Sequence, residues 1–434
     1  MRTLKSFEVS DEPTFRSNLI SWSQQFYETV WLESNAHLKT YSSFDAILAV
    51  DALTLIQTDA FNAFEDLKAY QQETKDWIFG YLTYDLKNDV ENLSSKNRDG
   101  LHFPELFFFQ PKKIIKITGK KVEFNYLNMV ADEIEEDFEL IRKGGSDYKT
   151  IEATKYIRIR MRIFKDEYYK GAHEMLRHIH RGDIYEANFC QEFYAEDTCI
   201  DPLGTYERLN SISKAPYATF LKLNDKYLLS ASPERYLRKE GTKIISQPIK
   251  GTAKRSINRM EDDLLKDRLE NDPKERAENI MIVDLVRNDL SKSALKGSVE
   301  VEELCKIYSY EQVHQMVSTV VAQVEESRNP VDIIKDSFPM GSMTGAPKIS
   351  AMKLIEELEG FKRGLYSGAV GYFTPENDFD FNVVIRSILY NETEKYVSYA
   401  VGSALTAKAL PEAEYEECLL KAKAMREVLE NSNE

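Results

Sequence analysis

Hydrophobic and polar residues alternate weakly at the start of the chain and more regularly later. In the first part, the pattern predicts a helix over Thr14–Thr29, a strand over Val30–Leu32 and a hairpin that turns at Gly119. A stretch of small and polar residues, Gly144–Thr150, is typical of an exposed joint. We therefore expect an amino-terminal subregion and a second, more regular region.

The second region has a sharper pattern. It predicts several short strands and four longer elements, which are a helix over Phe164–Asp183, a helix over Glu261–Asp289, one strand over Phe379–Tyr390 and a closing helix over Pro411–Asn431. Strands and helices come in blocks, which favours a large α+β fold over a doubly wound α/β fold. The predicted division of the chain is residues 1–150 and residues 151–434.

The composition excludes several classes of protein. The 434 residues include 57 Lys and Arg against 72 Asp and Glu, a net charge of −15, which argues against nucleic-acid binding through phosphate contacts. No run approaches the roughly 18 apolar residues of a membrane span, and the first residues lack the apolar part of a signal peptide. We therefore expect a cytoplasmic protein that has no membrane partner. The four cysteines form no CxxC pair, so neither a disulfide framework nor a Cys-rich zinc site is indicated.

Lys250 lies in a short motif, Gln247–Thr252, at the end of an apolar strand. Pro248 and Gly251 constrain the backbone on either side of it. A lysine held in this way can act as a nucleophile if its amine is neutral, which desolvation or a cationic neighbour would favour. The alternative is a surface lysine in a turn, and the spacing leaves both interpretations open.

Two pairs of acidic residues are spaced to share helix faces. Glu275 and Glu278 form one pair, and Glu414 and Glu417 form the other. If the pairs face one another, they can hold a magnesium ion that keeps several waters and binds an anionic substrate. The alternative is two solvated acidic faces, which are common in a chain of this net charge.

A loop of small residues, Met340–Lys348, leads into a predicted helix that starts near Pro347. The free amides at such a helix start can bind an anion. The loop lacks the spacing of a P-loop, so nucleotide binding is not indicated. A plain helix start is the alternative interpretation.

Nine runs of sequence between Gly182 and Met425, taken in order, resemble the motifs of the chorismate-utilising enzymes. They are GDIYEANFCQ, SASPERYL, QPIKGTAKR, DPKERAENIMIVDLVRNDL, VHQMVSTV, GSMTGAPKISAMKLIEELEG, YSGAVGYF, FNVVIRS and EAEYEECLLKAKAM. Two earlier segments, Trp31–Ala36 and Gly80–Asp85, are similar to parts of the large subunits of anthranilate and aminodeoxychorismate synthases. The resemblance implies two large, mostly antiparallel sheets packed face to face with helices outside. Both halves of the chain would then contribute to one intertwined unit.

The residue in the middle of the PI-x-GT motif separates members of the family. Anthranilate synthases typically have Ala there and aminodeoxychorismate synthases have Lys, and this chain has Lys250. The resemblance therefore implies that chorismate and ammonia are converted to 4-amino-4-deoxychorismate, on the route to 4-aminobenzoate and folate. The lysine would attack the ring and expel the allylic hydroxyl, and ammonia would then displace the lysine.

The resemblance also implies roles for other residues. Glu234 would be the general acid that protonates the departing hydroxyl, and its pKa would need to be raised for this task. Arg386 and Tyr372 would hold the enolpyruvyl carboxylate. The implied magnesium ligands are Glu278, Glu414 and Glu417, and the rest of the substrate pocket would be formed by Thr252, Thr344, Gly345 and Gly402.

The chain departs from the family pattern at three positions. Glu186 stands where a glutamine is frequent, Gln315 where many members have histidine, and Lys408 where aspartate is usual. We hypothesise that the carboxylate of Glu186 deprotonates incoming ammonium. Ser34 belongs to a Leu-Glu-Ser tripeptide that is similar to one lining the tryptophan site of anthranilate synthases, so it marks a possible tryptophan site.

The expected partners are chorismate, ammonia and a separate glutaminase subunit. None of the four cysteines lies in the glycine-flanked context of a glutaminase nucleophile, so the chain is expected to depend on another protein to release ammonia from glutamine. The nearest alternative is the large subunit of anthranilate synthase. Isochorismate and salicylate synthases are less expected because they place a lysine where Glu186 stands. A remote alternative is a noncatalytic module that binds chorismate.

Overall fold

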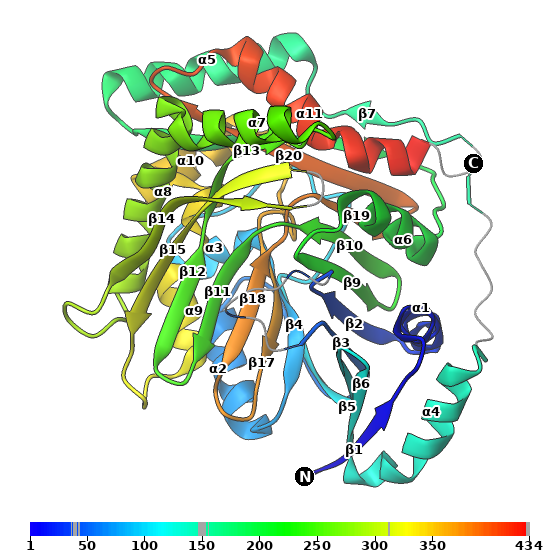
Figure 1. Cartoon of the computed structure of the whole chain (residues 1–434). Helices are drawn as coiled ribbons and strands as arrows, with labels where there is room; N and C mark the ends of the chain where they lie inside the picture. The colour runs from blue at the N-terminus through cyan, green and yellow to red at the C-terminus, as the bar shows by residue number, and fades with distance from the viewer. Residues whose placement is uncertain are drawn as a thin grey trace.

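The computed structural model describes residues 1–35, 37, 41, 44–145, 153–154, 156–310 and 313–430. The boundary predicted near residue 150 lies outside these residues. Every pairing between the named strands is antiparallel, and the pairings form one network that folds into two layers (Figure 1). The long strands β3 and β5 pair along their whole length and join the two layers.

The first layer contains strands from both halves of the chain. In spatial order they are β1 (Arg2–Glu8), β6 (Lys121–Leu127), β5 (Leu106–Thr118), β3 (Ala46–Thr58), β2 (Glu28–Glu33), β9 (Tyr217–Leu223), β10 (Lys226–Ser232), β19 (Ser387–Asn391), β20 (Tyr396–Thr406) and β8 (Glu186–Ala195), with β7 (Arg160–Met161) and β16 (Gly345–Ala346) beyond β8.

The second layer starts from the first half of β5. In spatial order it continues with β4 (Ile78–Leu82), β17 (Ala369–Phe373), β18 (Phe379–Val383), β11 (Arg235–Glu240), β12 (Lys243–Gln247), β15 (Val313–Gln323) and β14 (Glu300–Ser309), while β13 (Ile249–Lys254) extends from β12 along β15. The predicted hairpin at Gly119 is confirmed as the turn between β5 and β6.

Helices cover the outer faces of the layers. Their bounds are α1 (Glu12–Trp22), α2 (Ala63–Thr74), α3 (Lys87–Val90), α4 (Ile134–Arg142), α5 (Lys165–Arg181), α6 (Pro202–Ser213), α7 (Arg259–Asn271), α8 (Pro273–Ser291), α9 (Pro330–Ser337), α10 (Lys348–Leu358) and α11 (Pro411–Glu430), with short 3₁₀ turns η1 (Ser23–Gln25), η2 (Tyr84–Leu86), η3 (Asn128–Glu133) and η4 (Gly341–Met343). The two-layer sandwich with outer helices that the resemblance implied is confirmed. Among the described residues, no helix is both long and apolar enough to cross a membrane.

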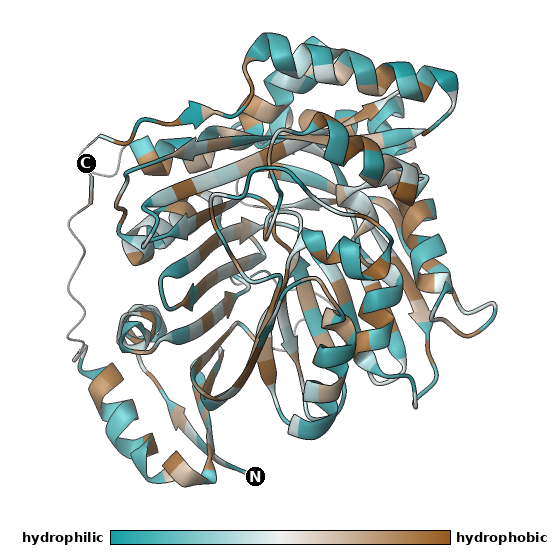
Figure 2. Ribbon diagram, turned by 180° about the vertical axis from the view of Figure 1, so that it is seen from behind, coloured by the Kyte–Doolittle hydropathy of each residue, from teal (hydrophilic) through white to brown (hydrophobic). Residues whose placement is uncertain are grey.

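The central strands of the first layer are buried on both faces. Neighbouring residues of β2 show this, because Val30 packs in the core that also contains Phe107 and Phe381 of the second layer, whereas Trp31 packs in the core under the outer helices. Successive side chains of a strand point to opposite faces, so one strand supplies two cores. The helices carry hydrophilic and hydrophobic residues side by side, as expected for elements that cover a core (Figure 2).

Three predicted elements are interrupted or shorter in the structure. The helix predicted over Glu261–Asp289 is two helices, because Asp272 leaves the helical conformation and Pro273, which lacks an amide hydrogen, starts α8. The strand predicted over Phe379–Tyr390 is also wrong, since Arg386 adopts a φ of 52° between β18 and β19. The predicted helix over Thr14–Thr29 ends at Trp22 of α1.

Candidate active site

Lys250 lies on β13 and faces carboxylates from two other elements. Its Nζ lies 3.7 Å from an oxygen of Glu186, the first residue of β8, and 3.8 Å from an oxygen of Glu278 on α8. Burial acts to lower the pKa of Lys250, but these carboxylates outweigh it and raise the pKa. The lysine is therefore a charged group held among acids, and the interpretation of a plain surface turn is wrong.

The acidic residues predicted on two helices converge on one place. α8 starts at Pro273 because the side chain of Asp272 accepts hydrogen bonds from the amides of Lys274 and Glu275, and this start directs Glu278 toward β13. The ammonium of Lys274 lies 3.2 Å from Glu414 of α11 and 3.8 Å from Glu278. The interpretation as two solvated faces is wrong for Glu278 and Glu414, since both are buried.

The chemistry of these carboxylates suits a cation. The Oε1 atom of Glu278 is buried without a hydrogen-bond partner in the described chain. Burial and the charge of Glu417 raise the pKa of Glu414, and burial and the charge of Glu278 raise that of Glu275. Among the described residues, no group of three His, Cys, Asp or Glu side chains is close enough to hold a metal ion as the side chains stand. Magnesium ligation by Glu278, Glu414 and Glu417 therefore stays a prediction.

Glu234 lies in the turn between β10 and β11 and is almost completely buried. Ser342 donates a hydrogen bond of 2.6 Å to its carboxyl group. Burial raises the pKa of Glu234 to about 7, although Ser342 and the charges of Lys250 and Lys421 oppose the rise. A carboxyl group with this pKa holds a proton near neutral pH and can donate it, which is the property that general acid catalysis requires.

Arg386 is half-buried in the break between β18 and β19. Within the described part of the chain, its guanidinium has no hydrogen bond and no salt bridge, and burial lowers its pKa. Tyr366 and Glu417 are the groups whose charges affect it. An uncompensated guanidinium next to these residues is suited to accept a carboxylate of a ligand.

The two tyrosines of the YSGAVGYF run lie in different surroundings. The ring of Tyr372 packs against Phe79 and Trp77, with both ring centroids 5.4 Å away, and the charged group that most affects its pKa is Asp380. The charge of Tyr366 acts on Arg386, whereas the charges that act most on Tyr372 are those of Asp380 and Arg238. Tyr366 is therefore the tyrosine of this run whose charge affects Arg386, and sequence reasoning missed it because both tyrosines belong to the same run.

Close packing explains two of the predicted glycines. A Cβ atom at Gly345 would lie 2.1 Å from the carbonyl oxygen of Glu186, and a Cβ atom at Gly402 would lie 2.5 Å from the sulfur of Cys190. Thr344 is buried, and its hydroxyl turns back to the carbonyl oxygens of Met340 and Gly341. These residues shape the loop beside β8, while their contacts with substrate stay predictions.

The remaining residues that the sequence singled out are Thr252, Gln315, Lys408 and Ser34. Thr252 pairs with Gln315 across β13 and β15, and Gln315 is buried with an unpartnered side-chain oxygen. Lys408 is exposed after β20. The backbone amide of Ser34 donates a hydrogen bond to the carbonyl oxygen of Asp45. Ser34 is not among the residues that line the cavity of about 290 Å³ formed by Tyr41, Tyr217 and Arg235. The tryptophan site therefore stays a prediction.

Sequence reasoning also missed cationic residues of the site. Lys274 lies four residues before Glu278, and Lys421 lies four residues after Glu417, so the helical spacing alone pairs each with a predicted magnesium ligand. Lys421 also donates a hydrogen bond of 2.8 Å to the carbonyl oxygen of Gly402. Figure 1 shows α11 lying over β20, which brings these groups together.

Comparison with known proteins identifies the family. A family model described as chorismate binding enzyme matches residues 21–427. The chain belongs to this family. Among chorismate binding enzymes, aminodeoxychorismate synthase component 1 of Bacillus subtilis (strain 168) is 30% identical over 440 residues, which cover 94% of this chain and 90% of that protein. Anthranilate synthase component 1 of Aquifex aeolicus (strain VF5) is 32% identical over 373 residues, which cover 82% and 75% of the two chains.

Other relatives share a shorter segment. The probable chloroplastic aminodeoxychorismate synthase of Oryza sativa subsp. japonica is 41% identical over 273 residues, which cover 62% of this chain but only 30% of that protein. The crystal structure of anthranilate synthase component I from Streptococcus pneumoniae TIGR4 superposes with a TM-score of 0.76 at 23% identity, and covers 90% of this chain and 94% of its own. The latter similarity establishes the chorismate binding enzyme fold.

Proposed function

We propose that the protein is the large component of an aminodeoxychorismate synthase, which converts chorismate and ammonia to 4-amino-4-deoxychorismate. The observation that carries the proposal is Lys250, whose ammonium nitrogen lies within 4 Å of Glu186 and Glu278 inside the site. Relatives that share this family include aminodeoxychorismate synthases of Bacillus subtilis and Oryza sativa at 30% and 41% identity.

The proposed reaction runs through Lys250 and Glu234. The neutral amine of Lys250 forms a bond to the ring of chorismate, and the allylic carbon–oxygen bond breaks. Glu234 donates its proton to the departing hydroxyl, which leaves as water; its pKa of about 7 supports this role. Ammonia then forms the new carbon–nitrogen bond and expels the lysine amine.

Glu186 is the residue best placed to handle protons on nitrogen in this scheme. Its side chain is buried, one carboxylate oxygen faces Lys250, and the other oxygen has no hydrogen-bond partner in the described chain. Burial raises its pKa, which makes the carboxylate a better base. We propose that Glu186 takes a proton from the lysine ammonium before attack, releases it to solvent, and then takes a proton from the incoming ammonium.

Glu278, Glu414 and Glu417 would hold the magnesium ion. When bound, the ion supplies positive charge that orients a carboxylate of the substrate and neutralises it in an acidic protein. The protein itself contributes Arg386, whose guanidinium has no salt bridge in the described chain and is suited to the enolpyruvyl carboxylate. Ammonia would come from a separate glutaminase subunit, and free ammonium would replace it in vitro.

Product identification tests the proposal. The purified protein is incubated with chorismate, magnesium and ammonium, and the products are separated by liquid chromatography and mass spectrometry. Formation of 4-amino-4-deoxychorismate is expected. Fluorescent anthranilate as the product would overturn the proposal in favour of anthranilate synthase, and binding of chorismate by isothermal titration without turnover would favour a noncatalytic module.

A further inference from the structure

Arg363 is a completely buried cation in the turn between α10 and β17. Its guanidinium donates two hydrogen bonds, of 2.8 and 2.6 Å, to the carboxylate of Glu359 at the end of α10. It also donates to the carbonyl oxygens of Met343 at 2.6 Å and of Asn188 at 2.8 Å. One side chain therefore connects the end of α10 and the loop at Met343 to β8, which lies 175 residues away at Asn188.

The partners of Arg363 leave it little freedom to move. Glu359 accepts a further hydrogen bond of 2.8 Å from the amide of Cys190, so the carboxylate is itself tied to β8. The side chains of Arg363 and Glu359 are each only 1% exposed. A buried charge pair tolerates little displacement, because any lost contact leaves a desolvated charge without a partner. The planar guanidinium adds a fixed geometry to these contacts.

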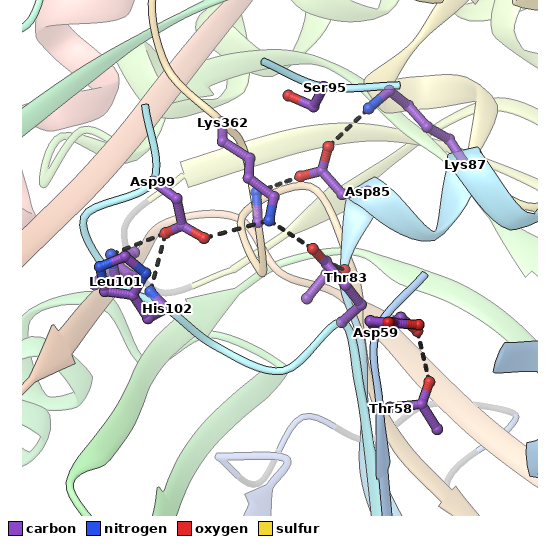
Figure 3. A network of polar contacts seen from close by, with 12 residues as sticks. Thr58, Asp59, Thr83, Asp85, Lys87, Ser95, Asp99, Leu101, His102 and Lys362 are labelled. Atoms are coloured by element: carbon purple, nitrogen blue, oxygen red, sulfur yellow. Dashed lines mark hydrogen bonds and ion pairs between the residues drawn. The ribbon is translucent and has the colours of Figure 1, made fainter. Parts of the chain in front are cut away.

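The amino-terminal half of the chain holds the same turn from the other side. Asp85 accepts a hydrogen bond of 2.9 Å from the amide of Gly364, and it is itself paired with the buried Lys87 at 2.7 Å (Figure 3). Lys362 binds Glu105 at 2.5 Å and Asp99 at 3.3 Å. The backbone of Arg363 is therefore anchored on both of its neighbours. Its guanidinium lies over the ring of Tyr84, 4.6 Å from the centroid, and donates to the carbonyl oxygens of Met343 and Asn188.

Both carbonyl groups that accept hydrogen bonds from Arg363 belong to residues close in sequence to residues of the proposed mechanism. Met343 follows Ser342, which donates its hydroxyl to Glu234, and Asn188 lies two residues after Glu186. The amide of Asn188 also donates a hydrogen bond of 2.8 Å to Thr344. A shift of the guanidinium would therefore move the loop that carries Ser342 relative to β8.

We propose that Arg363 is a positioning residue, which holds the Ser342 hydroxyl against Glu234 and holds β8 at a fixed distance from this loop. The inference rests on the proposed function only through the roles of Glu234 and Glu186. Arg363 touches none of the proposed reacting atoms. Its effect on the reaction is exerted through the carbonyl oxygens of Met343 and Asn188.

The test compares Arg363→Lys with a matched variant. Arg2 is the control because its guanidinium also joins a carboxylate, Asp76, to two backbone carbonyl oxygens, those of Pro111 and Asn125, but far from the site in the chain. Both variants keep a positive charge and lose the guanidinium fork. Melting temperature, kcat and KM for chorismate consumption, and the pH dependence of kcat are measured for each.

Arg363→Lys is expected to lower kcat about ten- to hundredfold with a smaller change in KM, because a displacement of about 1 Å is enough to cause such a loss. It is also expected to move the fall in kcat to higher pH. Glu234 is faced by Ser342, Lys250 and Lys421, which all lower its pKa, and a weakened contact with Ser342 removes one of these influences. Arg2→Lys should lower the melting temperature and leave the pH dependence unchanged.

An Arg363→Lys protein that loses thermal stability but keeps the kcat and pH dependence of the wild type would overturn the inference. If that variant does not fold, Glu359→Gln replaces it, because glutamine keeps an oxygen acceptor for the Cys190 amide and removes the charge that orients the guanidinium. An unchanged pH dependence of kcat in Glu359→Gln would likewise overturn the inference. A wild-type product other than 4-amino-4-deoxychorismate would overturn the proposed function, and the comparison of rates would remain valid.

Discussion

The ammonium of Lys274 lies 3.2 Å from a carboxylate oxygen of Glu414. The same nitrogen lies 3.8 Å from Glu278, so one flexible lysine stands between two proposed magnesium ligands that belong to different helices. The side chain of Lys274 is half-exposed, which allows it to turn outward into solvent. This lysine therefore neutralises carboxylates that would otherwise repel one another.

Lys274→Ala is expected to strengthen magnesium binding severalfold, because it removes a cation that competes for the same oxygens. Isothermal titration of magnesium into the protein measures this directly, and the magnesium concentration for half-maximal rate should fall in parallel. Lys423→Ala, a change of an exposed lysine on α11, serves as the control. Weaker magnesium binding by Lys274→Ala would contradict the competition between lysine and metal.

Lys250→Ala should abolish a covalent adduct between protein and substrate. With magnesium and chorismate present and ammonia omitted, the wild type is expected to gain the mass of chorismate less one water. Intact-protein mass spectrometry detects the adduct, and Lys254→Ala is a control at an exposed lysine of the same strand, β13. An adduct that persists in Lys250→Ala would show that another residue is the nucleophile.

The pH dependence of the rate should follow the protonation of Glu234. Because this group must be protonated to donate, kcat is expected to fall as the pH rises through about 7, the pKa that burial produces. Glu234→Gln cannot donate a proton and should lower kcat by about 10²–10⁴-fold. Ser342→Ala removes a hydrogen bond to the carboxylate and should move the fall to higher pH; a profile of Ser342→Ala identical to that of the wild type would contradict this assignment.

Glu234 should also make protein stability depend on pH. Its pKa in the folded protein is about 7, above the ordinary value of 4.5, so the folded state binds more protons between these values and stability falls as the pH rises through them. A displacement of this size corresponds to roughly 3 kcal/mol at high pH. Urea unfolding of Glu234→Gln at pH 5 and pH 8 should show a smaller loss of stability at pH 8 than the wild type shows.

Glu186→Gln tests whether the carboxylate on β8 handles protons. The variant keeps the size of the side chain and is expected to need a higher pH for the same ammonia-dependent rate, because free ammonia must then be supplied by the solvent. The rate is measured against ammonium concentration at several pH values. An unchanged pH profile and an unchanged rate would exclude Glu186 as a base.

Local sequence patterns predicted secondary structure correctly where the residues of a single element determine it. The hairpin at Gly119 and the strand at Val30 follow from turn chemistry and alternation, and both are present in the structure. The prediction failed where one residue interrupts a regular pattern. Helix-forming residues lie on both sides of Pro273 and apolar residues lie on both sides of Arg386, but a missing amide hydrogen ends one helix and a left-handed backbone ends one strand.

By itself, the sequence determined the family, the α+β class and the identity of the proposed nucleophile, because ordered motifs and residue spacing are local properties of the chain. Only the tertiary structure decided which groups surround Lys250. Glu186 and Glu278 come from β8 and α8, and burial among strands of both layers sets the pKa of Glu234. Distances and desolvation depend on how distant segments pack, so a linear pattern carries neither of them.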